Sequence, residues 1–376
     1  MGYAVGLMSG TSLDGVDAAL VDISEENEMT KVQLVAFETY SIPAETLKRI
    51  NQVLSIEESN VERICSLNVE LGYLFSDAVK QICQKAEIET EELEFVASHG
   101  QTIYHLPNPG HQQFSSTLQI GESAVICEET KTTVVSNFRE RDMANGGQGA
   151  PIVPYSEYVL YRDKKRTRLL QNIGGIGNVT VIPKNANLNQ LIAFDTGPGN
   201  MIIDELCRYF YQKEYDHGGA YAALGTVNQE LLAELMAHPF ISKSYPKTTG
   251  REDFGNEFTK QLLTKWPMAA NDLIATVTEF TAASIAENLK PFIDSETDLI
   301  VAGGGSYNGT LIQMLKAQLP DVHVVIQEDI GYSSEAKEAI AMTILGNQTL
   351  HHKPSNVPSA TGAKNPVILG KITYYN

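Results

Sequence analysis

The sequence predicts an α/β protein with two domains and mixed sheets, in which the second half repeats the plan of the first. Segments with the apolar pattern of strands alternate with segments of helical spacing, and this alternation is typical of α/β domains. A strand, a glycine-rich turn and a second strand occur at residues 3–23 and again at residues 168–182. The length of 376 residues is enough for two domains, since a domain typically has about 100 to 200 residues.

The first half opens with three successive strands, which indicates an antiparallel start to its sheet. Residues 3–8 are apolar, whereas residues 16–23 alternate apolar and polar positions. Two segments then have helical spacing, and the longer one, residues 60–86, is long enough to cover the sheet. The strands expected in this half are residues 3–8, 16–23, 32–40, 95–98 and 132–137, and the helices are residues 44–54, 60–86 and 122–129.

The second half follows residues 144–154, a stretch rich in glycine and proline that is a candidate domain junction or site loop. Its expected strands are residues 168–173, 178–182, 191–194, 299–302 and 322–326, and its helices are residues 201–211, 228–237, 271–293, 310–319 and 334–345. These segments predict an N-terminal lobe at residues 1–145, a C-terminal lobe at residues 146–350, and a tail at residues 351–376 that can join the N-terminal lobe.

Composition and charge exclude several classes of function. The net charge of −18, from 46 acidic and 28 basic residues, opposes nonspecific binding to nucleic acid or to an anionic membrane. No apolar run approaches the roughly 18 residues of a membrane span, and the N-terminus lacks the pattern of a secretory signal. The four cysteines are widely separated, as in proteins of the reducing cytoplasm, and the histidines lack zinc-site spacing. We therefore expect a cytoplasmic protein that binds neither nucleic acid nor membrane.

The first glycine-rich turn carries more hydroxyl and acidic groups than a plain hairpin needs. Its glycines allow a close approach of the backbone to a ligand, and its hydroxyls and amides can donate to phosphate oxygens. Magnesium prefers oxygen ligands, so Asp14 and Asp17 are candidate ligands, with Asp14 as the first choice. The alternative is a β-hairpin whose loop only reverses the chain. The candidate nucleotide-binding residues here are Gly10, Thr11, Ser12, Leu13, Asp14, Gly15, Val16 and Asp17.

Three further glycine-rich segments lie beside expected strands or helices. Residues 195–200, Asp-Thr-Gly-Pro-Gly-Asn, can present a carboxylate and helix N-terminal amides, or they form a turn with an asparagine N-cap. Residues 174–177 are a hairpin turn or a second phosphate-facing turn. Residues 303–308 let the backbone approach a base or ribose, and they fit a Rossmann fingerprint poorly; no P-loop motif occurs anywhere. The candidates are Asp195, Gly174, Gly175, Gly197, Gly199, Asn200, Gly303, Gly304, Gly305 and Asn308.

Polar side chains at three further places are candidates for binding a sugar. Residues 98–101 offer hydroxyl, imidazole and amide groups that suit a polyol, although a structural role for the histidine is the alternative. They cannot form a nucleophilic relay, because adjacent residues of a strand point to opposite faces. Arg139 and Asp142, before the glycine-rich loop, and Glu338, in the last predicted helix, are the charged candidates. The alternative for these three residues is that they are ordinary surface charges. The candidates are Ser98, His99, Gln101, Arg139, Asp142 and Glu338.

The residues and the order of these motifs resemble those of the anhydro-N-acetylmuramic acid kinase family, within the superfamily of sugar kinases, Hsp70 and actin. Residues 6–17, Gly-Leu-Met-Ser-Gly-Thr-Ser-Leu-Asp-Gly-Val-Asp, resemble the family's first phosphate motif, and residues 195–200 resemble the second. Residues 303–308 resemble the superfamily's adenosine motif. The resemblance covers essentially the whole chain. It implies two lobes of ribonuclease H-like type with an active-site cleft between them.

The resemblance also implies an activity. The family uses ATP and Mg²⁺ to convert 1,6-anhydro-N-acetylmuramic acid to N-acetylmuramic acid 6-phosphate in peptidoglycan recycling. The aspartate of the second phosphate motif is the family's catalytic base, which corresponds to Asp195, and the match at residues 138–151 relates Arg139 to the lactyl carboxylate of the sugar. A homodimer is the family expectation. Two alternatives remain open: another kinase of the superfamily that acts on a free hydroxyl, and a non-enzymatic nucleotide switch of the actin type.

Overall fold

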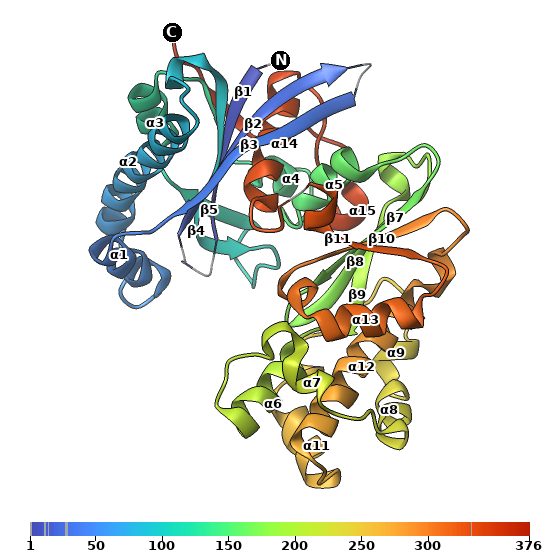
Figure 1. Ribbon diagram of the computed structural model, residues 1–376. Coiled ribbons are helices and arrows are strands. Elements are labelled where there is room, and N and C mark those ends of the chain that lie inside the picture. The colour runs from blue at the N-terminus through green and yellow to red at the C-terminus, as the bar shows by residue number, and fades with distance from the viewer. Residues whose placement is uncertain (1, 11–12, 14, 27–28, 332) are drawn as a thin grey trace. The chain divides into compact units, whose positions relative to one another are not determined.

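The chain forms two compact units, each with its own sheet. The structure, a computed structural model, describes residues 2–10, 13, 15–26, 29–331 and 333–376 (Figure 1). The first unit contains the chain up to Leu160 together with Glu335–Asn376, and the second unit is Tyr161–Ser334. The second unit is therefore inserted between two parts of the first.

These boundaries differ from the expected ones at residues 145 and 350. Helix α5 (Val153–Tyr161) belongs to the first unit, because Val153, Tyr155 and Leu160 pack against its core. Helix α14 (Lys337–Leu350) was expected in the C-terminal lobe, but it packs on strands β1, β2 and β4 of the first unit. The C-terminal tail also lies in the first unit.

The first unit contains a seven-stranded mixed sheet. Strands β1, β2 and β3 pair antiparallel, whereas β4 pairs parallel with both β1 and β6. The strand order is β12-β6-β4-β1-β2-β3, and β5 pairs with β4. The strands are β1 (Gly2–Ser9), β2 (Val16–Glu26), β3 (Met29–Tyr40), β4 (Leu93–Leu106), β5 (Ser116–Ile120), β6 (Val134–Ser136) and β12 (Lys371–Thr373).

Helices cover both faces of this sheet, and the period of two in the strands divides the core between them. Val5 and Leu7 of β1 pack with α2, whereas Ala4 packs on the opposite face with α14. An added Cβ at Gly6 would overlap the carbonyl oxygen of Ala339, so glycine permits the close approach of α14 to β1. The helices are α1 (Ala44–Leu54), α2 (Val61–Lys85), α3 (Ser123–Thr130), α4 (Glu140–Ala144), α5, α14 and α15 (Pro358–Thr361).

Helix α2 shows why the longest predicted helix forms. Asn60 caps its first turn, since the side chain accepts a hydrogen bond from the backbone N–H of Arg63 at 2.9 Å. Leu67, Leu71 and Phe75 recur at helical spacing and are buried against the sheet. The helix ends at Lys85, close to the predicted end.

The second unit contains a five-stranded mixed sheet of the same plan. Strands β7, β8 and β9 pair antiparallel, and β10 pairs parallel with both β7 and β11. The order β11-β10-β7-β8-β9 matches the order β6-β4-β1-β2-β3 of the first sheet. The strands are β7 (Thr167–Ile173), β8 (Ile176–Ile182), β9 (Ile192–Pro198), β10 (Thr297–Ala302) and β11 (His323–Ile326). The predicted α/β class, with mixed sheets and a repeated plan, is confirmed.

The helices of the second unit form two cores. Helices α12 and α13 pack on the sheet, and α12 also packs in a second, largely helical core with α6, α8 and α11 (Figure 1). The helices are α6 (Met201–Tyr211), α7 (Ala220–Ala223), α8 (Gln229–Met236), α9 (Pro239–Ser242), α10 (Arg251–Phe254), α11 (Asn256–Lys265), α12 (Ala270–Leu289) and α13 (Gly309–Gln318). Short 3-10 helices span Thr90–Glu92, Leu188–Gln190, His217–Gly219, Lys290–Phe292, Gly304–Tyr307 and Gln327–Ile330.

Strands β4 and β9 extend the furthest beyond the predicted ends. Strand β9 continues to Pro198, because Asp195 and Gly197 pair with Asn178 and Gly177 of β8. Strand β4 runs from Leu93 to Leu106, because its second half pairs with β5. Pairing partners therefore decide the ends of both strands, despite the polar and small residues there. None of the helices in the described part of the chain combines the length and apolar character that crossing a membrane requires.

Candidate active site

The start of the first glycine-rich turn, at Ser9 and Gly10, is held by hydrogen bonds to Gln101. The Ser9 hydroxyl donates to Gln101 Oε1 at 2.6 Å, and Gln101 Nε2 donates to the Gly10 carbonyl oxygen at 3.4 Å. Both side chains are buried, so Gln101 supports the turn and does not form an exposed sugar-binding edge as expected. Leu13 has a φ of 60° and packs against the core. The candidates Thr11, Ser12 and Asp14 lie outside the described residues.

The end of this turn joins β2 tightly. An added Cβ at Gly15 would lie 2.6 Å from Cγ2 of Thr39, so the turn requires glycine there. Val16 is fully buried, and Asp17 accepts a hydrogen bond from the Thr39 hydroxyl at 2.6 Å. The Val16 side chain belongs to the core, and the expected role of this residue in binding a nucleotide stays a prediction.

The turn at Gly174 and Gly175 is held against the start of α6. The backbone N–H groups of Gly199 and Met201 donate to the Gly175 carbonyl oxygen at 2.9 and 3.1 Å, and that of Asn200 donates to the Gly174 carbonyl oxygen at 2.8 Å. An added Cβ at Gly199 would overlap the Gly174 carbonyl oxygen. The expected phosphate donors Gly199 and Asn200 are thus already engaged. What this turn can offer a phosphate is its own N–H groups.

Asp195 lies in β9 and is oriented by the backbone. Its Oδ2 accepts from the backbone N–H of Thr249 at 2.9 Å, and its own N–H donates to the Lys247 carbonyl oxygen at 3.0 Å. Burial raises the pKa of the Asp195 carboxyl, and the Thr249 hydrogen bond offsets part of that rise. A held carboxylate with a raised pKa suits a general base.

Two neighbours of Asp195 have packing roles. Gly197 has a φ of 126°, and an added Cβ would overlap the Ser284 hydroxyl of α12. The close approach of β9 to α12 therefore explains this glycine, and its expected role in binding the nucleotide stays a prediction. Lys247 is buried, and its Nζ donates to the carbonyl oxygens of Phe240 and Ile241 at 3.0 Å each. This fixes the segment that carries Thr249.

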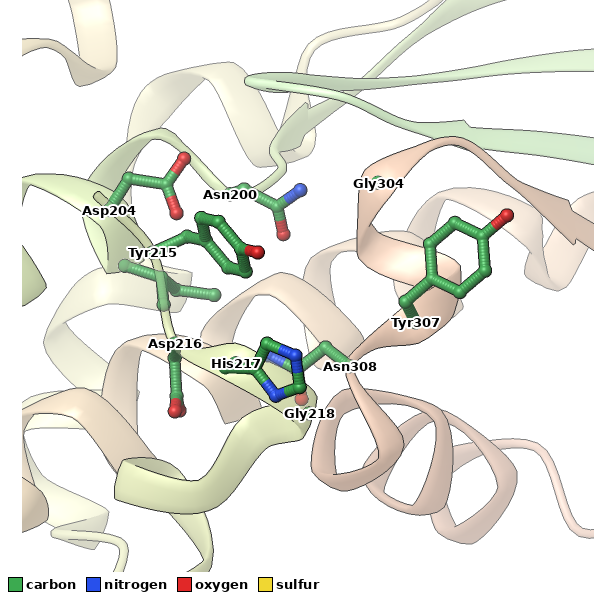
Figure 2. Close-up of a pocket in the computed structure, with 10 residues that line it drawn as sticks. Asn200, Asp204, Tyr215, Asp216, His217, Gly218, Gly304, Tyr307 and Asn308 are labelled. Atoms are coloured by element: carbon green, nitrogen blue, oxygen red, sulfur yellow. The ribbon is translucent and has the colours of Figure 1, made fainter. Parts of the chain in front are cut away.

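A pocket of about 650 Å³ lies within the second unit, next to the third glycine-rich segment (Figure 2). Tyr215 and Tyr307 stand on opposite sides of it, and His217 lies between them at one end. The rings of Tyr215 and His217 are stacked, with centroids 6.1 Å apart. Its lining also includes Asn200, Asp204, Gly304 and Asn308. Aromatic walls with a few polar groups suit a planar heterocycle that carries hydroxyl groups.

The three glycines at residues 303–305 have different roles. Gly303 has a φ of 82°, and an added Cβ would lie 2.6 Å from Oδ1 of Asn172. Gly305 packs against Ile173 at the end of β7. Only Gly304 lines the pocket, where an added Cβ would have the Asn200 amide nitrogen at 3.7 Å. Asn308 also caps α13, since its Oδ1 accepts from the Leu311 N–H at 3.0 Å. This segment thus provides one wall of the pocket.

We expect Asp204→Asn to increase the free energy of unfolding at pH 7.5. Burial raises the pKa of the Asp204 carboxyl to about 6; Arg208 opposes this shift, and Glu205 adds to it. A carboxyl group whose pKa is higher in the folded state binds its proton more tightly there, so stability falls as pH rises from about 4 to 6. The variant should therefore be more stable than wild type above pH 6, with the difference lost near pH 4. Urea unfolding across this pH range measures it, and equal stability at pH 7.5 would contradict the prediction.

In the first unit, the candidates of residues 98–101 are buried. Ser98 and His99 are 1% and 3% exposed. The Ser98 hydroxyl has no hydrogen-bond partner among the described residues. His99 Nδ1 lies 2.8 Å from the Gly100 carbonyl oxygen, and its Nε2 accepts from Arg139 Nε at 3.0 Å. Direct contact of His99 with a sugar is therefore excluded in this structure, and the imidazole supports Arg139.

Asp142 and Glu338, the two acidic candidates, have opposite environments. Asp142 is fully buried and accepts three hydrogen bonds, so it does not contact a sugar directly in this structure. Glu338 lies exposed in the first turn of α14 and acts electrostatically on Arg139. Burial lowers the pKa of Arg139, and the charges of Glu338 and Glu140 counteract this. Glu338 is thus the exposed member of this cluster, and Arg139 is partly buried.

The match to known proteins decides the family. The family model described as anhydro-N-acetylmuramic acid kinase matches residues 2–375. The chain belongs to the anhydro-N-acetylmuramic acid kinase family. Among curated relatives, the anhydro-N-acetylmuramic acid kinases of Bacillus cereus (strain Q1) and Bacillus anthracis (strain A0248) are 55% and 54% identical to it over 378 residues. The alignments cover 99% of this chain and 99% of each relative.

Among solved structures, component A of (R)-2-hydroxyglutaryl-CoA dehydratase from Acidaminococcus fermentans superposes with a TM-score of 0.43 and 12% identity, covering 91% of this chain and 95% of that chain. This similarity is too low to support an argument about an anhydro-N-acetylmuramic acid kinase. The family assignment rests on the sequence matches.

Sequence reasoning missed several residues around this kinase site. Tyr215, His217 and Asp204 line the pocket from a connecting segment and a helix. The Gly218-Gly219 pair that directly follows His217 is the one signal in the sequence that could have pointed to this segment. Tyr307 lies within the third glycine-rich segment and could have been found from that position. Thr249 orients Asp195 through a backbone N–H, which leaves no signal in the side-chain pattern. In the described part of the chain, no three His, Cys, Asp or Glu side chains form a group that could hold a metal ion.

Proposed function

We propose that this chain uses ATP and water to convert 1,6-anhydro-N-acetylmuramic acid to N-acetylmuramic acid 6-phosphate and ADP, a step of peptidoglycan recycling. Membership of the anhydro-N-acetylmuramic acid kinase family supports the activity and the substrate. The single structural observation that carries the mechanism is Asp195, a carboxylate with a raised pKa that the Thr249 N–H holds in β9, opposite Asn178 of β8.

Asp195 acts as the general base in this proposal. It takes a proton from a water molecule, whose oxygen forms a bond to the anomeric carbon C1 of the sugar. The bond between C1 and O6 breaks, and O6 receives the γ-phosphoryl group of ATP, so ADP leaves. One base thus activates the water, while the departing O6 is the phosphoryl acceptor. The Thr249 N–H keeps the carboxylate oriented without neutralising it.

ATP is assigned to a pocket and to glycine-rich turns. We assign the base and ribose to the pocket between Tyr215 and Tyr307, and the phosphates to the turn at residues 174–175 of the same unit. The turn at residues 10–15 of the first unit stays a candidate phosphate motif from the sequence. Mg²⁺, when bound with ATP, neutralises phosphate charge, and it usually needs only one or two protein carboxylates. Asp14 remains the proposed ligand from the sequence.

The sugar carboxylate is assigned to Arg139. This guanidinium is partly buried, with Nε and Nη1 engaged by His99 and Gly149, so it is pre-organised to hold a carboxylate. Glu338, exposed nearby, is assigned to the hydroxyl or amide groups of the sugar. A cytoplasmic location and a homodimer complete the proposal, because ATP is supplied in the cytoplasm and the family expectation is a dimer.

Incubation with ATP and the anhydro sugar in ¹⁸O-labelled water tests the function. We expect one ¹⁸O atom at C1 of a 6-phosphorylated product, detected by mass spectrometry, and no product when ATP is omitted. An unlabelled product would reject attack by water. Phosphorylation of a free hexose but not of the anhydro sugar would instead indicate an ordinary sugar kinase.

A further inference from the structure

Asp142 connects three segments that are far apart in the sequence. Its Oδ2 accepts from the Gly149 N–H at 2.8 Å, and its Oδ1 accepts from Asn356 Nδ2 and the Thr361 hydroxyl at 2.8 Å each. All of these groups belong to the first unit, and the Asp142 side chain has no exposed surface. Hydrogen bonds to a buried carboxylate are among the stronger ones in proteins, so the loop and the C-terminal segment are firmly joined.

Gly149 links Asp142 to Arg139 through its two backbone hydrogen bonds. The Gly149 carbonyl oxygen accepts from Arg139 Nη1 at 2.8 Å. Gly149 has a φ of 69°, and an added Cβ would lie 2.7 Å from Cγ of Met143, so only glycine fits this loop conformation. The N–H on one side of this residue is held by Asp142, while the carbonyl on the other side holds the guanidinium. The position of Arg139 therefore depends on Asp142.

His99 holds the same guanidinium from the other side. Burial lowers the pKa of the His99 imidazole to about 4, and the charge of Arg139 contributes to this shift. The imidazole is therefore neutral at pH 7. A neutral ring that donates from Nδ1 to the Gly100 carbonyl oxygen presents Nε2 as an acceptor, which matches the Arg139 Nε–H at 3.0 Å. Two fixed acceptors thus define the plane of the guanidinium.

The C-terminal segment adds backbone contacts to the same loop. The Gln148 N–H donates to the Thr361 carbonyl oxygen at 2.9 Å, and the Lys364 N–H donates to the Asn145 carbonyl oxygen at 3.0 Å. Asn145 Nδ2 also donates to the Asn365 carbonyl oxygen at 2.7 Å. Removal of one side-chain donor to Asp142 therefore leaves the fold of the loop supported while changing the carboxylate that aligns Gly149.

We propose that Asn356 and Thr361 are positioning residues for substrate recognition, because they hold Arg139 in place through Asp142 and Gly149. The inference rests on the proposed function, in which Arg139 binds the sugar carboxylate. These two residues lie in the C-terminal segment, more than 200 positions from Asp142 in the sequence. Their predicted effect is on binding of the anionic sugar and not on ATP or the chemical step.

Thr361→Val is the sharpest variant, because it removes the hydroxyl with almost no change of shape. We expect the KM for the anhydro sugar to rise about tenfold, as for the loss of a hydrogen bond to a charged group, with kcat and the KM for ATP unchanged. The Thr361 hydroxyl also accepts from the Ala363 N–H at 3.3 Å, a longer contact within the C-terminal segment that does not involve Asp142. Thr361→Ser keeps the hydroxyl and should have a KM near that of wild type. An unchanged KM in Thr361→Val, or an equal rise in both KM values, would overturn the proposal.

A double-mutant cycle with Arg139→Ala separates positioning from a general loss of structure. Arg139→Ala alone should raise the KM for the sugar about a hundredfold. In that background Thr361→Val should add no further rise, because the group that it positions is absent. Additive effects would mean that Thr361 acts by another route. Asn356→Asp, which places a second carboxylate beside Asp142, should raise the sugar KM in the same Arg139-dependent way.

Nuclear magnetic resonance distinguishes failure of this inference from failure of the proposed function. The Arg139 Nε–H signal, assigned by its loss in Arg139→Ala, should shift in Thr361→Val and return in Thr361→Ser. This readout needs no substrate. A shift without any activity on the anhydro sugar would reject the function and keep the positioning, whereas an unmoved signal in an active enzyme would reject the positioning.

Discussion

Replacing Asp195 with Asn is expected to lower kcat by about 10²- to 10⁴-fold, the range in which a positioned general base contributes. Asparagine keeps the shape of the side chain, and its amide oxygen can still accept from the Thr249 N–H. It cannot take a proton from water. ATP binding should therefore remain unchanged, as measured by isothermal titration, while ADP release in a coupled assay is nearly lost.

Asp321→Asn is the matched control for this prediction, because the same chemical change is made at an exposed position of the same unit. It should keep wild-type kcat. The acidic limb of the pH profile adds a second check. Because burial raises the pKa of Asp195, activity should fall with acid at a higher pH than an ordinary aspartate would give. Near-normal kcat in Asp195→Asn would remove Asp195 from the role of base.

The second large effect is expected at Asp298, where the free energy of unfolding should fall by about 3 kcal/mol on substitution by Asn. This buried carboxylate of β10 accepts from Arg166 Nε at 2.8 Å, and it also pairs with Arg168 and with His323. Asparagine leaves the two arginines without their common anion. The loss stays near 3 kcal/mol because the Arg166 and His323 side chains are partly open to solvent.

The pH dependence of this loss follows from the pKa of Asp298. Burial raises that pKa, but the arginines and His323 outweigh burial and leave it below the ordinary value. The stabilisation is therefore complete above the unfolded pKa of about 3.9 and disappears as pH falls through the lower folded pKa. Urea unfolding from pH 7.5 to pH 3 should show the wild type and Asp298→Asn converging at the acidic end.

Asp294→Asn provides the control for Asp298, since Asp294 pairs with Lys184 at 3.3 Å on the surface. A surface pair contributes at most about 1 kcal/mol, so this variant should remain close to wild type. Equal losses in the two variants would mean that the buried position of Asp298 has no special role.

The sequence predicted the fold well where local pattern and packing agree. Helices α1 and α6 span the predicted residues, because their apolar positions repeat at helical spacing and face a core. The predicted strand ends at Phe194, before the observed end of β9 at Pro198, because Asp195–Pro198 have the composition of a turn. Hydrogen bonding with β8 keeps them extended, and no pattern within β9 reveals that partner.

The sequence predicted the motifs of the candidate site. It did not predict which residues of each motif pack within the protein and which line the pocket. A glycine that lets two segments pack and a glycine that approaches a ligand look identical in sequence. Only the neighbours Ser284 and Asn200 distinguish Gly197 from Gly304. Likewise, the burial of Asp142 depends on donors from the C-terminal segment, at a separation that no local pattern encodes. Tertiary partners therefore decide these roles.

The close approach of α14 to β1 at Gly6 has a consequence for biosynthesis. Strand β1 leaves the ribosome before Tyr161–Ser334, whereas its covering helix α14 follows only after the whole of that segment. Domains generally fold as units during synthesis, in the order in which they become complete. The second unit is complete while the first still lacks α14 and β12. The first unit is thus expected to finish folding after the second, once α14 and β12 have followed Tyr161–Ser334.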